Sequence, residues 1–216
     1  MSLYADASQD DYLTYIQSFV DTNECSYQQQ VDMRVMRCNL IRCNKKVDIL
    51  LTFPQDNHWI IYESSFYMNE SEEDKQMEIL QLASTQGNSY AMVDLAKKFS
   101  DIYSKNLNLK KSLELLQQST ELGNPMAPYE MFELYSLYQF SKYYNDSIMV
   151  GVPKITTEQL NSLLILACER KNVKAICFFI EKYTSESNNN ERLRILHIGI
   201  ELGHREFNHK SLVRNF

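Results

Sequence analysis

The chain contains little glycine and little proline, with 5 glycines and 4 prolines in 216 residues. Folds built from many short strands need frequent tight turns, and these two residues form most such turns. Their scarcity therefore disfavours a turn-rich β-sandwich. Helices are the expected main structure.

Basic charge, long apolar runs and targeting segments are also missing. The net charge is −6, lysine and arginine are scattered, and no basic cluster is longer than a pair such as Lys45-Lys46. We therefore expect no nucleic-acid binding. No run of 18 apolar residues is present, so we expect no membrane span. The first residues, MSLYADASQDDYL, lack the basic and apolar blocks of a secretion signal, and if this start is the native one we expect a cytoplasmic protein.

Motifs of catalysis and metal binding are absent as well. The sequence has no glycine-rich phosphate loop, no G-x-S-x-G and no H-E-x-x-H, so we expect no cofactor and no metal site. The 5 cysteines form no C-x-x-C pair: Cys25, Cys38, Cys43, Cys168 and Cys177. We expect most of them to be buried thiols, with a Cys168–Cys177 disulfide as the alternative in an exported protein.

The histidines are the natural place to look for a catalytic base: His58, His197, His204 and His209. The last three are spaced by seven and five residues, which does not put all three on one helix face. A Cys–His hydrolase using Cys168 or Cys177 with His197 is the enzymatic alternative. Such a pair lacks the third group that orients a catalytic base.

What the sequence does contain is an internal repeat. Gly87-Asn88 and Gly123-Asn124 lie 36 residues apart, and the flanking positions match in kind. The matched pairs are Ile79 with Leu115, Ala83 with Ser119, Ser84 with Thr120, Ala91 with Ala127, Leu95 with Met131, and Phe99 with Tyr135. Glycine ends a helix in the left-handed conformation, and asparagine caps the next helix. Pro125 is expected in the first turn of that next helix.

Two weaker copies follow. In the first, Ala167-Cys168 and Asn172 stand at the matching positions, 48 residues after the second copy, which places an insertion near 144–155. In the second, Gly203-His204 repeats the glycine step and leads into a polar end, as expected of a terminal cap. Paired helices repeated in this way predict a mainly α fold, an αα-hairpin solenoid over residues 69–216.

The run NLKKSLELLQQSTELGN, residues 108–124, resembles the second half of a Sel-one-like repeat, Asp-x-x-Lys-Ala-x-x-Trp-x-x-Lys-Ala-Ala-x-x-Gly. Leu115 replaces the family's Trp, Ser112 an Ala and Phe132 a Gly. The resemblance covers residues 70–210 and implies a right-handed, tetratricopeptide-like superhelix of about three to four repeats. Members of that family mostly serve as adaptors or scaffolds, and bacterial members include immunity proteins.

Residues 1–68 lack the repeat and predict a small α+β region. Residues 10–20, DDYLTYIQSFV, have the apolar spacing of an amphipathic helix. Alternation at Val31, Met33 and Val35, followed by VDILLTF and HWIIYESSF around the turn-rich PQDN, favours a three-stranded meander. The alternative is a further pair of helices.

The segment 125–144 carries more aromatic side chains than one buried stripe needs. Met131 and Tyr135 are expected in the core between repeats. The candidate partner-binding residues on a concave face are Tyr129, Phe132, Tyr138, Phe140, Tyr143 and Tyr144, and the alternative is that they fill the space under the insertion. The sequence thus favours a non-catalytic module that binds a protein partner, and the resemblance implies that this partner is a toxin or effector. The alternatives are the Cys–His hydrolase and a structural homodimer.

Overall fold

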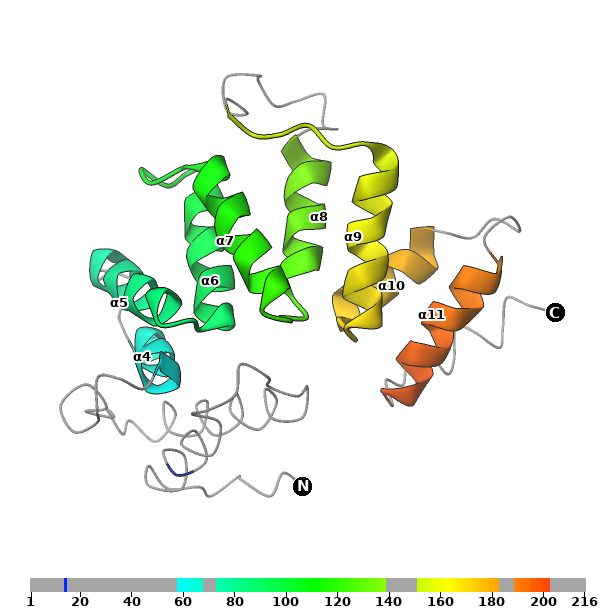
Figure 1. The fold of residues 1–216 in the computed structure, drawn as a ribbon, viewed down its shortest axis with the longest axis horizontal. Coiled ribbons are helices and arrows are strands. Elements are labelled where there is room, and N and C mark those ends of the chain that lie inside the picture. Colours follow the sequence, from blue (N-terminus) through cyan, green and yellow to red (C-terminus); the bar gives the residue numbers. More distant parts are fainter. Residues whose placement is uncertain (1–13, 15–57, 68–72, 139–150, 183–188, 203–216) are drawn as a thin grey trace. The chain divides into compact units, whose positions relative to one another are not determined.

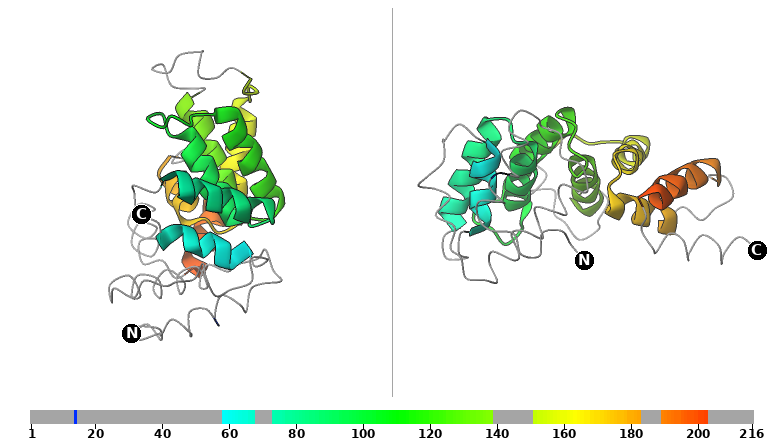
Figure 2. Two further views of the ribbon diagram at one scale, coloured as in Figure 1. Left: turned by 90° about the vertical axis from the view of Figure 1, so that its left-hand side faces the viewer. Right: turned by 90° about the horizontal axis from the view of Figure 1, so that it is seen from below.

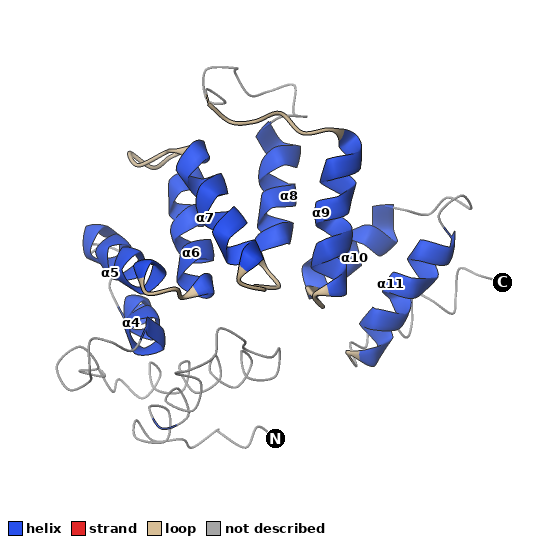
Figure 3. Ribbon diagram, viewed as in Figure 1, coloured by secondary structure: helices blue, strands red, loops and turns tan. Residues whose placement is uncertain are grey.

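The computed structural model describes residues 14, 58–67, 73–138, 151–182 and 189–202 (Figure 1). These residues form eight α-helices, α4 to α11, with one 3-10 turn and no strand (Figure 3). The prediction of a mainly helical protein is therefore confirmed for the described part. The chain divides into two compact units, Met1–Leu107 with Glu121–Gly123, and Asn108–Thr120 with Asn124–Phe216. The predicted boundary between residues 68 and 69 falls within the first unit and stays a prediction.

In the first unit, α5 (Glu73–Thr85) packs against both α4 (His58–Ser64) and α6 (Ser89–Ser100). A 3-10 turn, η1 (Ser65–Tyr67), connects to the end of α4 and also contacts α5. The buried apolar centre of this unit includes Trp59, Leu80 and Leu95.

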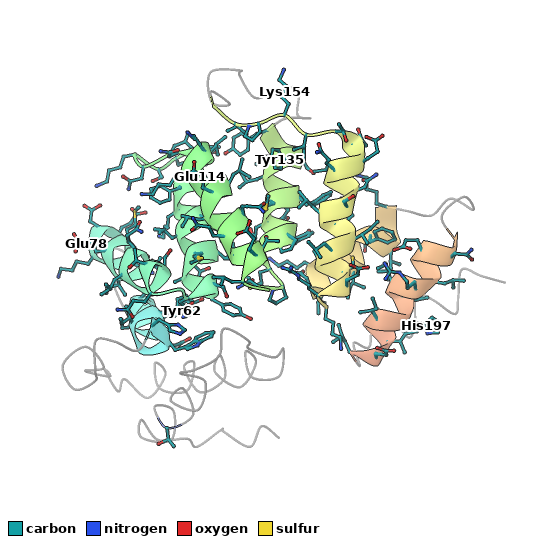
Figure 4. The ribbon with its side chains drawn as sticks, in the orientation of Figure 1. Tyr62, Glu78, Glu114, Tyr135, Lys154 and His197 are labelled. Carbon is teal, nitrogen blue, oxygen red and sulfur yellow. The ribbon has the colours of Figure 1, made fainter. Side chains whose placement is uncertain are left out.

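The prediction of a strand in HWIIYESSF is wrong, because residues 58–64 form α4. Helical spacing puts Trp59 and Tyr62 on one side of the turn, and both rings meet Tyr90 of α6, at centroid distances of 5.4 and 6.4 Å. The Tyr62 hydroxyl, labelled in Figure 4, donates to Asp94 at 2.8 Å. These tertiary contacts outweigh the β-propensity of the sequence. The other predicted strands, 31–35 and VDILLTF, and the helix at 10–20 lie outside the described residues, apart from Thr14, which is helical.

The second unit contains α7 (Leu109–Glu121), α8 (Ala127–Tyr138), α9 (Thr157–Glu169), α10 (Val173–Lys182) and α11 (Asn189–Glu201). Helix α9 packs against α8 and α10, and α11 covers both α9 and α10 (Figure 2). The fully buried side chains of the second unit include Phe132, Leu164, Ile176 and Ile195. Consecutive helices therefore pack as an array within this unit, whereas a solenoid across the whole repeat region stays a prediction.

The turns between the paired helices share one geometry. The second residue after each helix has a positive φ: 90° at Gly87, 85° at Gly123 and 64° at Lys171. The asparagine amide that follows donates to a carbonyl five residues back, the bond that closes a Schellman motif. The three bonds are Asn88 to Ala83 at 3.0 Å, Asn124 to Ser119 at 3.1 Å and Asn172 to Ala167 at 3.0 Å. The predicted glycine–asparagine turn is confirmed twice, and the third copy repeats it with lysine in place of glycine.

Asn88 and Asn172 also cap the next helices, whereas Asn124, predicted to do the same, bonds to the Met126 amide before α8 begins. The Asn88 side-chain oxygen accepts from the amides of Tyr90 and Ala91 at 3.0 and 2.9 Å. Asn172 accepts from Ala175 at 3.1 Å. In each copy the small residue three positions on is fully buried, which allows close helix packing: Ala91, Ala127 and Ala175.

The position predicted for Pro125 is wrong by two residues. Helix α8 begins at Ala127, and its first main-chain bond runs from Glu130 to the Met126 carbonyl. Pro125 therefore precedes the helix. Asn124 turns the chain there by accepting from the Met126 amide at 2.8 Å.

Candidate protein-binding surface

The predicted binding residues on α8 are mostly buried. Tyr129, Phe132 and Tyr138 expose 6%, 2% and 4% of their surface, so all three belong to the packed interior. Phe140, Tyr143 and Tyr144 lie outside the described residues. Tyr135, labelled in Figure 4, is buried as predicted, and so is Met131.

Tyr129 and Phe132 nevertheless form the base of a partly exposed cluster between α8 and α10. The Phe132 ring meets Phe178 of α10 edge to face, at 5.1 Å and 66°, and stacks on Tyr129 at 6.0 Å and 24°. Both arrangements are favoured for aromatic pairs. Phe178 itself is only half-buried. We call Tyr129, Phe132, Glu133, Phe178 and Lys182 the α8–α10 cluster.

The sequence of α10 explains why Phe178 and Lys182 lie on its outer side. Ala175, Ile176 and Phe179 are buried, which fixes the inner face of the helix. Phe178 and Lys182, four residues apart, share the adjoining face. The Lys182 ammonium lies 5.3 Å from the centre of the Phe178 ring and 5.8 Å from that of Phe132. This cation–π arrangement places a positive charge at the edge of an apolar floor.

A carboxylate lies on the α8 side of the cluster. Burial raises the pKa of Tyr129 to about 12, and the nearby charge and hydrogen bond of Glu133 raise it in the same direction. The phenol therefore stays protonated at neutral pH and is held against Glu133. The cluster thus combines aromatic rings with an acidic group from α8 and a basic group from α10.

Sequence reasoning identified Tyr129 and Phe132 but missed Phe178 and Lys182. The local signal was the spacing of an aromatic residue and a lysine four positions apart, on the face of α10 that adjoins its buried face. That spacing alone does not show which aromatic partner lies opposite. The contact with Phe132 joins residues 46 positions apart (178 − 132) and depends on how the helices pack.

One cysteine of the hydrolase alternative, Cys168, has the properties of a structural thiol. Cys168 is fully buried, and burial raises the pKa of its thiol to about 12. A nucleophilic cysteine needs a thiolate, which such a pKa makes rare at neutral pH. His197 is exposed on α11 (Figure 4). His58 lies on α4, where its ring nitrogen is 3.2 Å from the Asn88 amide nitrogen. His204 and His209 lie outside the described residues.

Cys168 and Cys177 are both thiols, so the alternative of a disulfide between them is wrong. Among the described side chains, no three histidine, cysteine or acidic residues are grouped to hold a metal ion. None of the described helices is long and apolar enough to cross a membrane.

Comparison with protein-family models, with curated proteins and with solved structures finds no match to this chain. The resemblance to Sel-one-like repeats therefore stays a prediction.

Proposed function

We propose that the chain is a non-catalytic module that binds a protein partner through the α8–α10 cluster. The observation that carries the proposal is the partly exposed Phe178 ring, which packs edge-on against buried Phe132 and is bordered by Lys182. Aromatic anchors of this kind dominate the free energy of many protein interfaces. The predicted role of Tyr129 and Phe132 changes accordingly: they support the anchor from beneath.

The rigidity of the cluster favours binding. Phe178 packs against a buried ring, and Lys182 is placed by its contacts with two rings, so little side-chain freedom remains to be lost when a partner binds. Burying a fully exposed phenylalanine contributes about 1.5–3 kcal/mol, and because Phe178 is already mostly buried, covering the rest of its ring contributes only part of that. The cluster is therefore suited to a small apolar contact with charged borders.

The charges of the cluster suggest the chemistry of the partner. An apolar side chain would cover Phe178, an acidic group would face Lys182 and a basic group would face Glu133. The net charge of −6 favours a partner segment that is basic overall. A toxin or effector is one such partner, as the resemblance to Sel-one-like immunity proteins implies.

The proposal is tested by reversing the charge of one exposed lysine at a time. Three tagged forms would be used to purify partners from cells that express the chain: the wild type, Lys182→Glu and Lys154→Glu. Quantitative mass spectrometry would compare the amount of each partner that they retain. Lys154 is also exposed and precedes α9 (Figure 4), so its replacement makes the same charge change away from the cluster. The same purified partner would then be titrated against Phe178→Ala.

We expect Lys182→Glu and Phe178→Ala each to weaken binding about 5- to 30-fold. Lys154→Glu should bind as the wild type does. Equal binding by all variants, with their circular dichroism unchanged, would contradict the proposal. Light scattering on the wild type checks the homodimer alternative in the same samples.

A further inference from the structure

A second exposed feature lies in the first unit, in the segment 101–107 that follows α6. Its sequence, DIYSKNL, has no glycine and places two apolar residues at the tip. Ile102 is 37% exposed and Tyr103 is 91% exposed. The two residues are adjacent, so the tip of the loop presents two apolar side chains to solvent together. We call residues 101–107 the Tyr103 loop.

Hydrogen bonds fix the path of the loop. The amide of Tyr103 donates to the Asp101 carboxylate at 2.9 Å, and the amide of Ser104 donates to the Asp101 carbonyl at 3.0 Å. The amides of Asn106 and Leu107 then donate to the hydroxyl and the carbonyl of Ser104, at 3.1 and 3.2 Å. Two successive turns therefore hold the backbone on both sides of Tyr103.

The loop is also tied to α5. The side-chain amide of Asn106 donates to the sulfur of Met77 at 3.2 Å. The Lys105 ammonium lies 2.9 Å from the Asp74 carboxylate, and this ion pair raises the pKa of Lys105. A loop that only connects two helices needs neither contact. Together they hold the exposed tip in one place relative to α5.

We propose that the Tyr103 loop is a docking element that inserts Tyr103, with Ile102 beside it, into an apolar pocket of a protein partner. A loop whose backbone is already ordered loses little backbone freedom on binding, and this lowers one of the costs of association. The tyrosine hydroxyl calls for a hydrogen-bond acceptor at the far end of the pocket. The inference rests on the proposed function, and it adds a contact in the first unit to the cluster in the second.

A protein pocket fits the loop better than a membrane surface does. The net charge of −6 opposes approach to anionic lipids. The one lysine of the loop, Lys105, is already paired with Asp74. A second copy of this chain is also less suitable, because a loop inserted head to tail into an identical chain gives open assemblies unless the contacts close into a ring.

The experiment uses a photoreactive benzophenone side chain placed, one site at a time, at Tyr103, Phe178 and Leu82 of the full chain. Leu82 is the control, since it is an apolar residue of α5 in the same unit and is 46% exposed. Cells that express the chain are irradiated, and the adducts are identified by mass spectrometry. The protein found at position 103 is then purified and titrated against the wild type, Tyr103→Ala, Tyr103→Phe and Leu82→Ala.

We expect one protein adduct at position 103 and none at position 82. Tyr103→Ala should weaken the purified complex about 30-fold, whereas Leu82→Ala leaves its Kd unchanged. Tyr103→Phe should lose less affinity, since it removes only the hydroxyl. A lipid adduct, an adduct with a second copy, no adduct at position 103, or an unchanged Kd in Tyr103→Ala would overturn the inference.

The same samples separate the two proposals. A protein adduct at position 178 without one at position 103 would contradict the docking role of the Tyr103 loop but would agree with the proposed function. The absence of protein adducts at both positions would contradict both proposals.

Discussion

Arg170 donates through one guanidinium nitrogen, Nη1, to the carbonyl of Thr120 at 2.8 Å and to that of Asn124 at 3.1 Å. Arg170 is the residue that ends α9, and the two carbonyls belong to the end of α7 and the start of the segment leading to α8. One side chain thus joins two successive copies of the repeated turn. Carbonyls at a helix end have no partner within the helix, so a cation is well placed there.

The first prediction concerns this contact. Arg170→Met keeps the apolar stem but removes the donor, and it should lower the free energy of unfolding by about 1.5–3 kcal/mol, as expected for hydrogen bonds to a charged group. Urea unfolding followed by circular dichroism measures the change. Lys154→Met, at an exposed position before α9, is the control and should stay within about 0.5 kcal/mol of the wild type. Equal stability of the two variants would show that the contact adds nothing.

The second prediction separates two tasks of Asn172. Its side-chain oxygen caps α10, and its side-chain nitrogen donates to the Pro125 carbonyl at 3.2 Å. Asn172→Asp keeps the cap and loses the donor, whereas Asn172→Ala loses both. We expect Asn172→Ala to be the less stable, by about 1 kcal/mol. An alanine variant as stable as the aspartate variant would mean that the cap contributes nothing.

Asn88 divides its side chain in the same way, since its nitrogen donates to the His58 carbonyl at 3.2 Å while its oxygen caps α6. The order of stability found at Asn172 should therefore recur at Asn88. Asparagine is suited to this position because it offers both a donor and an acceptor.

The third prediction uses the positive φ shared by the turns. No atom lies within 4 Å of the position where a side-chain carbon would stand at Gly87 or Gly123, so alanine there meets no obstacle and its cost is backbone strain alone. Gly87→Ala should cost about 1–2 kcal/mol. Lys171 already has a φ of 64°, and Lys171→Gly should stabilise the chain by up to about 1 kcal/mol. Thermal unfolding would show both shifts, and a destabilising Lys171→Gly would mean that the lysine side chain contributes more than the strain costs.

These turns show what the sequence could predict. The geometry of a Schellman turn is local, and glycine followed by asparagine encodes it directly, so Gly87-Asn88 and Gly123-Asn124 were identified without a structure. Lys171 was identified by alignment to them. The helix at His58–Ser64 was not predicted, because its β-branched and aromatic residues suit a strand, whereas its packing on α5 and on Tyr90 of α6 favours a helix.

The candidate site was predicted in part for the same reason. The aromatic richness of α8 is visible in the sequence, but which side of each ring is covered depends on contacts with α9 and α10. Tyr138 is buried and Phe178 is partly exposed, although both are aromatic residues at helical spacing. The exposure of Tyr103 could likewise not be predicted from the sequence, because it depends on the turns that Asp101 and Ser104 make around it.

The fourth prediction concerns cysteine reactivity in the native chain. Cys168 is fully buried with its pKa raised to about 12, whereas Cys177 is half-buried. At neutral pH, iodoacetamide should therefore label Cys177 at least ten times faster than Cys168, because attack requires an accessible thiolate. Peptide mapping by mass spectrometry follows each site separately, and in urea the two rates should converge. Fast native labelling of Cys168 would instead favour the hydrolase alternative.

The fifth prediction follows from Tyr129 and applies at alkaline pH. Its pKa is about 12 in the folded chain, against an ordinary value of 10.0, so the unfolded chain loses this proton first. The stability that Tyr129 contributes is complete below pH 10 and is lost as the pH rises towards 12. The free energy of unfolding should therefore fall less steeply over this range in Tyr129→Phe than in the wild type. Tyr103→Phe, at a residue that is 91% exposed, is the control and should keep the wild-type slope. If both variants follow the wild-type curve, the Tyr129 hydroxyl ionises as readily in the folded chain as in the unfolded one, and its proposed burial against Glu133 is wrong.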